Sequence, residues 1–361
     1  MIFSSVALSL MAPALCLGMP VNKAAAKKAS AKHKIEPCKN ASSFSLLTYN
    51  VAGLPEIINE NGIKDKKLSA SFIGQYIREQ SYDVVHLQED FHLHDVILNN
   101  DNHTFHTASS GKVVEGDGLN TLSHYNASHF DRYTWKECAV NGGDCLTPKG
   151  FTHMISNVGG FEVDLYNLHA DAGNEWPDRL ARREGLDQLL RHIKKHTKDR
   201  PVILAGDFND RWTCSKRGID KLTEAGFTDA WVKLHHNNTI PEPNGKSNNC
   251  AHPPKDNSCE VVDKVFYRSG KSVTLDAYKF NYDNDIFFMK DNSQPSDHSP
   301  LRVDFSWARK EFNCPTEVKK PEKKVKTDED IVREWQEEDI KKAKEFKPIL
   351  YPGGRGLDIW D

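Results

Sequence analysis

The sequence predicts an α/β (α+β) protein in which two packed sheets are flanked by helices. Two observations predict this class. Segments with strand character outnumber the segments with a good helical pattern. The longer strand segments are half-apolar as well as fully apolar, whereas a doubly wound parallel sheet needs continuous apolar strands because both of its faces are buried.

The strand segments are short runs rich in β-branched and aromatic residues. They are expected at 44–51, 83–89, 161–169, 201–207, 261–268 and 299–305. Two other segments, 67–80 and 178–196, repeat apolar residues at helical spacing. The expected apolar stripes are Leu68, Phe72, Tyr76 and Ile77 in the first helix and Leu186, Leu189, Leu190 and Ile193 in the second.

Length and composition limit the class of protein. The chain has 361 residues, of which 38% are apolar and 27% charged, and this suits a soluble globular protein. Its net charge of −3 gives no global basic field that would indicate a nucleic-acid partner. Shifts in composition divide the chain into a signal peptide (1–18), a flexible basic arm (19–43), a folded domain (44–314) and a charged C-terminal tail with a short helix (315–361). We interpret the tail as a solvated segment, the alternative being a partner-binding peptide.

The N-terminus indicates a secreted, extracellular protein. Met1–Gly18 contains a short apolar stretch that ends in small residues, which is typical of a signal peptide, although no Lys or Arg precedes the stretch. Four N-x-S/T sequons fit a glycosylated chain, at Asn40, Asn102, Asn126 and Asn237.

Disulfides are expected in a secreted protein. Removal of the signal peptide takes Cys16 and leaves seven cysteines, so one thiol should be free or intermolecular. Cys138 and Cys145 bracket a turn-rich loop that a disulfide would close. No pair of cysteines has the spacing of a zinc site.

Polar side chains end or follow several of the apolar runs, namely Asn50, Glu89, Asn167, His169, Asp207 and Asn209. Asp263 lies inside the run 261–268, and Asp297 and His298 open the last strand. Each of them alone fits a turn former or a surface residue. Asp207 and Asn209 are two residues apart, so both should lie on one face if the strand continues. We expect the whole set to converge on one point if the strands pack side by side.

The set contains the parts for phosphoester hydrolysis. Carboxylate and amide oxygens, as in Glu89 and Asn50, are the hard ligands that Mg²⁺ or Ca²⁺ prefer. The two histidines, His169 and His298, can donate to phosphate oxygens or move protons. The chain lacks a G-x-S-x-G motif, which argues against a serine acyl-enzyme. The residues therefore favour metal-assisted attack of water on a phosphoester.

The motifs TYNVAGLPE, VVHLQED, NLHADAG, LAGDFNDRW, VVDKVFY and PSDHSPL follow the order and approximate spacing of a known superfamily. Over about Phe44–Trp307 the chain resembles the endonuclease/exonuclease/phosphatase superfamily, which includes deoxyribonuclease I, neutral sphingomyelinases and inositol-polyphosphate 5-phosphatases. The resemblance implies a four-layer sandwich of two mostly antiparallel sheets flanked by helices. It also implies a divalent cofactor, Mg²⁺ in the first place, with Mn²⁺ or Ca²⁺ as alternatives.

The resemblance assigns a role to each matching residue. Glu89 matches the main metal ligand with Asn50 beside it, and Asp297 is expected near the metal. His169 matches the histidine that holds a phosphate oxygen, Asp207 the residue that orients or deprotonates water, and Asn209 a phosphate-positioning amide. His298 matches a second catalytic histidine, and Asp263 is expected to orient it. Some members carry an acidic residue where this chain has Ala52, so a second metal position has less support.

The substrate is less defined. The segments 116–125 and 141–151 resemble neutral sphingomyelinases, and Lys149 in the second is either a phosphate contact or a solvated loop lysine. By contrast, Cys214 and Cys259 resemble the placement of a disulfide in deoxyribonuclease I. This resemblance implies a Cys214–Cys259 bond, with Cys250 as the rival for either partner.

Two surface features bear on the choice between lipid and DNA. The loops 91–109 and 232–260 are rich in His, Asn and Pro rather than Arg and aromatic residues, which argues against tight DNA binding. The run Ile286–Met289 is expected to be an ordinary strand, but its exposure would favour a lipid substrate. We expect a phospholipase C or sphingomyelinase-like phosphodiesterase. The alternatives are a deoxyribonuclease I-like endonuclease, an inositol-phosphate phosphatase and a catalytically weak binding protein.

The expected partner is thus a phosphoester substrate, either a lipid head group or nucleic acid. Peripheral membrane contact accompanies the lipid interpretation. No stable protein partner is predicted, and we expect a monomer.

Overall fold

The computed structural model describes residues 40–55, 61–113, 115–140 and 144–311. The predicted signal peptide, nearly all of the basic arm, Cys38, Cys314 and the C-terminal tail lie outside the described residues. Among the residues that are described, no helix has the length and apolar character needed to cross a membrane.

Two six-stranded sheets form the centre of the described region. The first has the order β11-β12-β1-β2-β4-β3 and the second the order β5-β6-β7-β8-β10-β9. The strands of the first sheet are β1 (Ala41–Asn50), β2 (Val84–Gln88), β3 (Phe105–His106), β4 (Asn120–Ser123), β11 (Val273–Tyr282) and β12 (Leu301–Arg309). Those of the second are β5 (Ala127–Thr134), β6 (Gly150–Val158), β7 (Phe161–His169), β8 (Val202–Asp207), β9 (Thr228–Asp229) and β10 (Asp263–Arg268).

Each sheet is built around one parallel pair of strands. In the described residues β1 pairs in parallel with β2, and β7 with β8, while the other strand pairs are antiparallel. A parallel pair needs a crossover, which α1 (Lys66–Gln80) supplies in the first sheet and α3 (Trp176–His196) in the second. The two sheets thus repeat one arrangement, although the sequence shows no internal repeat.

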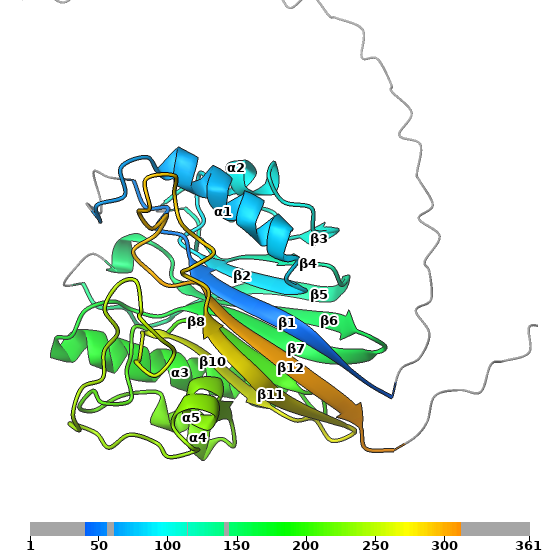
Figure 1. Ribbon diagram of the computed structural model, residues 1–361. Helices are drawn as coiled ribbons and strands as arrows, with labels where there is room; N and C mark the ends of the chain where they lie inside the picture. The colour runs from blue at the N-terminus through cyan, green and yellow to red at the C-terminus, as the bar shows by residue number, and fades with distance from the viewer. Residues whose placement is uncertain (1–39, 56–60, 114, 141–143, 312–361) are drawn as a thin grey trace, which may run out of the picture. The chain divides into compact units, whose positions relative to one another are not determined.

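The helices cover the outer faces of the sheets, which gives the predicted four layers. Shorter helical segments are α2 (His94–Leu98), a 3₁₀ turn (Asp144–Leu146), α4 (Asp220–Glu224) and α5 (Ala230–His235). Figure 1 shows α1 and α2 on one side of the sheets and α3, α4 and α5 on the other. The fold class predicted from the sequence is therefore confirmed.

The long helices begin where side chains satisfy their free N–H groups. Asp65 caps α1 by accepting a hydrogen bond from the Leu68 amide at 2.9 Å. Glu175 and Asp178 form a capping box at the start of α3, where Pro177 occupies the first turn.

Two apolar clusters hold the layers together. The larger one joins the facing sides of the sheets and α3, with residues such as Leu46, Leu204 and Leu189 fully buried. The smaller one packs Ile73 and Ile77 of α1 against the first sheet. Burying one such side chain stabilises the fold by roughly 1.5–3 kcal/mol.

The predicted apolar stripe of α1 is wrong at Leu68, which is 47% exposed. Leu68 lies in the first turn of the helix, where it borders a surface groove instead of the sheet.

Several predicted strands differ from the structure. Strand β1 begins at Ala41 because its first residues pair with the end of β12. Strand β12 begins at Leu301, so Asp297 and His298 lie in the preceding loop. The prediction that Ile286–Met289 forms a strand is wrong: this run is a turn after β11.

One of the two expected disulfides is absent from the described residues, and a different pair of cysteines is bonded instead. Cys138 bonds to Cys145 as predicted, but Cys259 bonds to Cys250, and Cys214 is free. The expected Cys214–Cys259 bond is therefore wrong. The backbone explains the pairing, since Asn249 and Glu260 form an isolated β-bridge and the Cys250 amide donates to the Glu260 carbonyl at 3.1 Å. This places the Cys250 and Cys259 Cα atoms 4.9 Å apart.

The pairing predicts different effects for two serine substitutions. Cys250→Ser should lower the free energy of unfolding by about 2–3 kcal/mol, because the closed loop no longer restricts the unfolded chain. Cys214→Ser, which breaks no disulfide, should change it by less than about 0.5 kcal/mol. Urea denaturation of both variants checks this, and a large loss in Cys214→Ser alone would contradict the pairing.

Candidate active site

The predicted polar residues meet where the two parallel strand pairs end. In the first sheet Asn50 lies beside Gln88, and Glu89 follows directly. In the second sheet Asp207 lies between His169 of β7 and Asp263 of β10. Strands of the two sheets pack face to face, β1 against β8 among them. The edges that carry these residues therefore come together.

The Asn50 side chain connects both sheets. Its Nδ2 lies 3.1 Å from Glu89 Oε1, 3.2 Å from Asp207 Oδ2 and 3.5 Å from His298 Nε2. Its Oδ1 accepts a hydrogen bond from the Ala52 amide at 3.0 Å. In this orientation Asn50 presents N–H groups to the two carboxylates and fixes their positions. A role as a metal ligand stays a prediction.

Asp207 lies at the centre of the site and is buried. Its Oδ2 is 3.4 Å from His169 Nε2 and 3.7 Å from His298 Nε2. Burial, with a smaller contribution from nearby Lys149, lowers the pKa of His169 to about 3. His169 is therefore neutral at physiological pH and offers one N–H donor.

Asp207 and Asn209 meet through a turn and not through a shared strand face. Strand β8 ends at Asp207, and Asn209 adopts a left-handed φ of +48°. The Asn209 amide N–H donates to Asp207 Oδ1 at 2.9 Å, and its side chain donates to the Ala170 carbonyl at 3.1 Å. Asn tolerates this conformation better than most residues. Asn209 therefore lies beside the site because of the turn, and not because strand residues two apart share a face.

His298 forms the predicted hydrogen bond with Asp263. Its Nδ1 lies 3.0 Å from Asp263 Oδ2, which leaves Nε2 directed at Asp207 and Asn50. Burial alone would lower the pKa of His298. The carboxylates of Asp263 and Asp207 overcome that effect and hold the pKa well above its usual value. His298 is therefore an imidazolium at neutral pH and a ready proton donor.

Glu89 has an incomplete set of partners. It is 8% exposed, and its Oε2 has no hydrogen-bond partner among the described residues. Burial raises the pKa of Glu89, and the hydrogen bond from Asn50 only partly offsets this. Its backbone φ of +53° is rare outside glycine and typical of functional positions. A buried carboxylate with an open oxygen fits a hard divalent cation.

Two further features bear on the metal. Asp207, Asp263 and His298 each place one donor atom within 4.8 Å of the others. Asp263 and His298 of this group already share a hydrogen bond, whereas Glu89 Oε2 has no partner among the described residues. Glu89 as the main metal ligand stays a prediction. Asp297 is exposed, and its charge adds to the raised pKa of Glu89; its role as a ligand stays a prediction.

Lys149 and Ser296 complete the surroundings. Lys149 is not a solvated loop lysine: its side chain is 12% exposed and forms an ion pair with Asp144 at 2.5 Å. Ser296 was not singled out from the sequence. Its Oγ donates to the Asn50 carbonyl at 2.6 Å and accepts from the His298 amide at 3.1 Å, which fixes the loop that carries His298. A Ser two residues before His298 was the only signal, and serine is common in loops.

Two packed sheets with a carboxylate- and histidine-lined centre, where the parallel strand pairs end, define the class of fold. The chain belongs to the endonuclease/exonuclease/phosphatase family, whose pattern matches residues 47–298. It is 36% identical over 273 residues to a sphingomyelinase of Mycobacterium tuberculosis and equally to one of Mycobacterium bovis. The match covers 73% of this chain and 53% of each relative, so the chain spans about half the length of these relatives.

Solved structures share the fold. Beta toxin from Staphylococcus aureus with bound magnesium ions is 19% identical with a TM-score of 0.53, and covers 73% of this chain and 99% of its own. Sphingomyelinase C from Streptomyces griseocarneus is 19% identical with a TM-score of 0.51 and the same coverage. D. rerio TDP2 complexed with a single-strand DNA product is 17% identical, again with a TM-score of 0.51 and the same coverage. At these identities the likeness concerns the fold and does not separate lipid from DNA.

Proposed function

We propose that this protein is a secreted, divalent-metal-dependent phosphodiesterase of the phospholipase C or sphingomyelinase type. The similarity to mycobacterial sphingomyelinases, at 36% identity over 273 residues, carries the proposal. The predicted signal peptide and the Cys138–Cys145 and Cys250–Cys259 disulfides support secretion. The substrate is a choline phospholipid such as sphingomyelin, and the product is the phosphorylated head group.

Each residue of the site has a proposed role in the hydrolysis of the phosphodiester. Glu89 would hold the cation, which would supply positive charge against the developing charge of the phosphoryl group. Asp207 accepts the proton of the attacking water, and neutral His169 donates to a phosphoryl oxygen. Asn209 helps to position the substrate. His298, kept protonated by Asp263, donates a proton to the leaving alkoxide.

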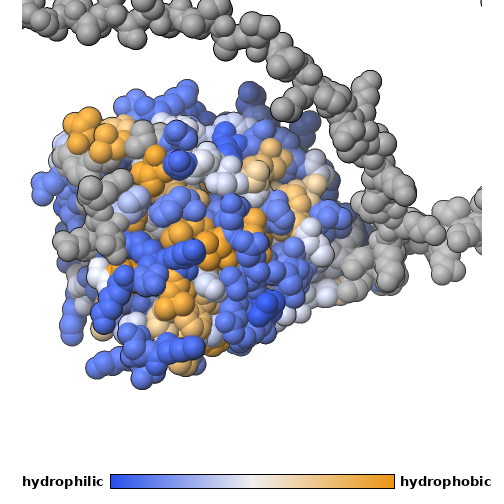
Figure 2. Space-filling view, turned by 90° about the horizontal axis from the view of Figure 1, so that it is seen from above, coloured by the Kyte–Doolittle hydropathy of each residue, from blue (hydrophilic) through white to orange (hydrophobic). Residues whose placement is uncertain are grey.

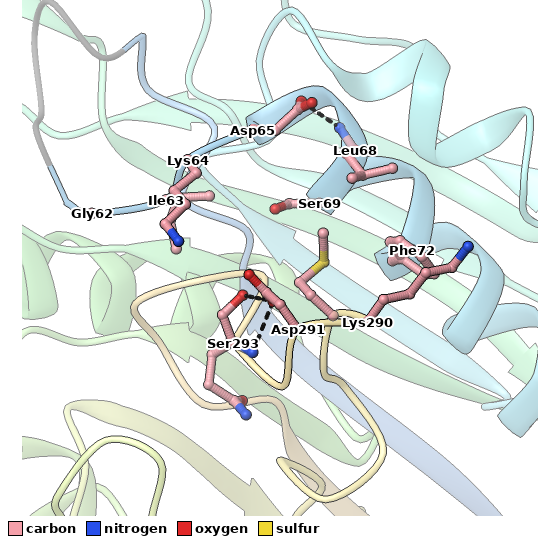
Figure 3. Close-up of a pocket in the computed structure, with 12 residues that line it drawn as sticks. Gly62, Ile63, Lys64, Asp65, Leu68, Ser69, Phe72, Lys290, Asp291 and Ser293 are labelled. Atoms are coloured by element: carbon pink, nitrogen blue, oxygen red, sulfur yellow. Dashed lines mark hydrogen bonds between the residues drawn. The ribbon is translucent and has the colours of Figure 1, made fainter.

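The surface around one groove supports a lipid substrate. The groove lies between the start of α1 and the loop 289–294, and its lining includes Ile63, Leu68 and Phe72 (Figure 3). Met289 also lines it. Phe288, which precedes the groove residue Met289, is 40% exposed. Seen from the α1 side, apolar side chains reach the surface in patches between hydrophilic ones (Figure 2). The loop continues directly to Asp297 and His298 of the site.

The loop is anchored so that one aromatic side chain stays outside. Phe287 is fully buried, with ring centroids 5.3 Å from Tyr49 and 5.6 Å from Tyr76. The Tyr76 hydroxyl donates to the Phe288 carbonyl at 2.6 Å. An exposed aromatic residue on a fixed turn suits contact with a membrane interface.

The substitution Phe288→Ser tests this contact. It should lower the rate on sphingomyelin vesicles by about tenfold, because burying a Phe side chain in the interface stabilises binding by roughly 1.5–3 kcal/mol. The rate on the soluble ester p-nitrophenylphosphocholine should not change. Tyr278→Ser, at another exposed aromatic residue on β11, is the matched control and should leave both rates unchanged. An equal loss on both substrates would contradict the membrane role.

Phosphorus NMR of the products tests the proposed function itself. The purified protein with Mg²⁺ is offered sphingomyelin, duplex DNA and an inositol polyphosphate, with His298→Ala as the inactive control. We expect phosphocholine from sphingomyelin and none in the control. Nucleotide ends from DNA, or free orthophosphate from the inositol polyphosphate, without phosphocholine, would overturn the proposal in favour of a nuclease or a phosphomonoesterase.

A further inference from the structure

A second pocket, which adjoins the active site, is formed by the segment that follows β5 and by the start of the loop after β7. It has a volume of about 360 Å³, and its lining includes Trp135, Asp144, Leu146, Lys149 and Asp171. Trp135 Nε1 donates to the His169 carbonyl at 2.7 Å, and Asp171 follows His169 by two residues. Lys149 lies between the two sites, since its charge acts on both Glu89 and His169 while its Nζ pairs with Asp144.

The charged groups of this pocket favour a cationic ligand. Its lining contains two carboxylates, Asp144 and Asp171, and one cation, Lys149, which pairs with Asp144. Asp171 is 2% exposed, and its Oδ2 accepts the Ala139 amide at 2.6 Å. Nearby Arg182 donates to the carbonyls of residues 171–173, and its charge also acts on buried Asp210. Burial raises the pKa of Asp171 to about 6, and the Asp144 carboxylate adds to this, while the Ala139 amide and the charges of Lys149 and Arg182 offset it only in part.

The apolar part of the lining suits methyl groups. Trp135 is nearly buried and supplies an aromatic wall, while Leu146 is 66% exposed at the rim. Aromatic rings beside carboxylates bind quaternary ammonium groups through cation–π attraction and dispersion, a combination that a strongly hydrated primary amine matches less well. The Cys138–Cys145 disulfide also lines the pocket and joins the two sides of its loop.

We propose that this pocket is the subsite for the quaternary ammonium group of the substrate, with Asp171 and Trp135 as its specificity-determining residues. The proposal rests on the proposed function, because it names the head group that the same active site accepts. A zwitterionic head group then has its phosphate at Glu89, His169 and Lys149 and its cation beyond Lys149, against Asp171. The site thus binds the negative phosphate and the positive ammonium group of the ligand at two separate places.

Direct binding tests the subsite without turnover. Isothermal titration calorimetry of the full chain compares phosphocholine with 3,3-dimethylbutyl phosphate. This isostere keeps the phosphate and has a carbon atom in place of the quaternary nitrogen, so the two ligands differ only in the cationic centre. We expect phosphocholine to bind about tenfold more tightly, which corresponds to the upper part of the usual cation–π range. Asp171→Asn, which retains an oxygen to accept the Ala139 amide, should reduce this difference, because only the Trp135 contact with the cation remains. Equal binding of both ligands to the wild-type protein would overturn the inference.

Kinetics separate this inference from the proposed function. With p-nitrophenylphosphocholine, Asp171→Asn should raise KM about tenfold and leave kcat nearly unchanged. With p-nitrophenyl 3,3-dimethylbutyl phosphate, which lacks the cationic centre, the same substitution should change neither constant. Asp276→Asn, at an exposed aspartate on β11, is the control and should behave as wild type. Turnover of sphingomyelin with no preference for the charged ester would overturn the subsite alone. Absence of sphingomyelin turnover, together with selective phosphocholine binding, would overturn the proposed function and retain the subsite.

Discussion

Glu89→Gln is expected to lower kcat/KM by about a thousandfold while leaving the fold intact, which is the size of effect seen when a main charge-stabilising group is lost. Gln has nearly the same shape, and its Oε1 still accepts from Asn50 Nδ2. It places an uncharged amide where the open Oε2 of Glu89 now lies. The site then loses the negative charge that we assign to cation binding.

Thermal unfolding gives a readout that does not depend on activity. The raised pKa of Glu89 means that the folded state binds a proton more readily than the unfolded chain, so the ionised side chain destabilises the metal-free fold above that pKa. Without metal, Glu89→Gln should therefore unfold at the same or a higher Tm. Added Mg²⁺ should raise the Tm of the wild type by mass action, but not that of the variant.

The matched control is Glu162→Gln on β7, since that carboxylate is half exposed and lies 3.9 Å from its nearest cation, Arg200. This variant should keep both the activity and the Mg²⁺ response. A Glu89→Gln protein that retains the Mg²⁺-induced rise in Tm would show that the cation binds elsewhere, with the Asp207, Asp263 and His298 group as the next candidate.

Asp263→Asn is expected to reduce kcat by about a hundredfold or more, with little change in the free energy of unfolding. The Asn oxygen can still accept from His298 Nδ1, so the ring keeps its orientation. The substitution removes the carboxylate that does most to hold the pKa of His298 above its usual value. A smaller fraction of His298 is then protonated at neutral pH.

The pH–rate profile distinguishes this positioning role from a structural one. Because the pKa of His298 is raised, the imidazolium persists below that pKa, and activity should fall as the pH rises through it. In Asp263→Asn the alkaline limb of the profile should move to lower pH. The double variant with His298→Ala should be no slower than His298→Ala alone, since Asp263 acts through His298. An unchanged alkaline limb would contradict the assignment.

Local sequence patterns predict the limits of several helices and strands. Strand β7 has the predicted limits, and β2, β8, α1 and α3 differ from the predictions by one or two residues. Their apolar residues are continuous or recur at a clear period, so periodicity alone identifies them. By contrast, β5 and β11 mix apolar residues with polar and charged ones, and β3 and β9 are two residues long. Pairing with neighbouring strands, which is non-local, holds these elements in place.

Local sequence patterns predict the two-sheet class and the residue types of the site. Apolar runs that end in Glu89, His169 and Asp207, with His298 just before the last strand, supply hard-ligand and proton-transfer groups. The tertiary structure sets which groups touch: the Asn50 bridge between the sheets, the Cys250–Cys259 bond and the Asp144–Lys149 pair beside Asp171. These contacts depend on loop paths and on the packing of one sheet against the other. The Asn50 contacts join residues far apart in the chain, and the two other pairs depend on the path of a loop. Local propensity encodes neither.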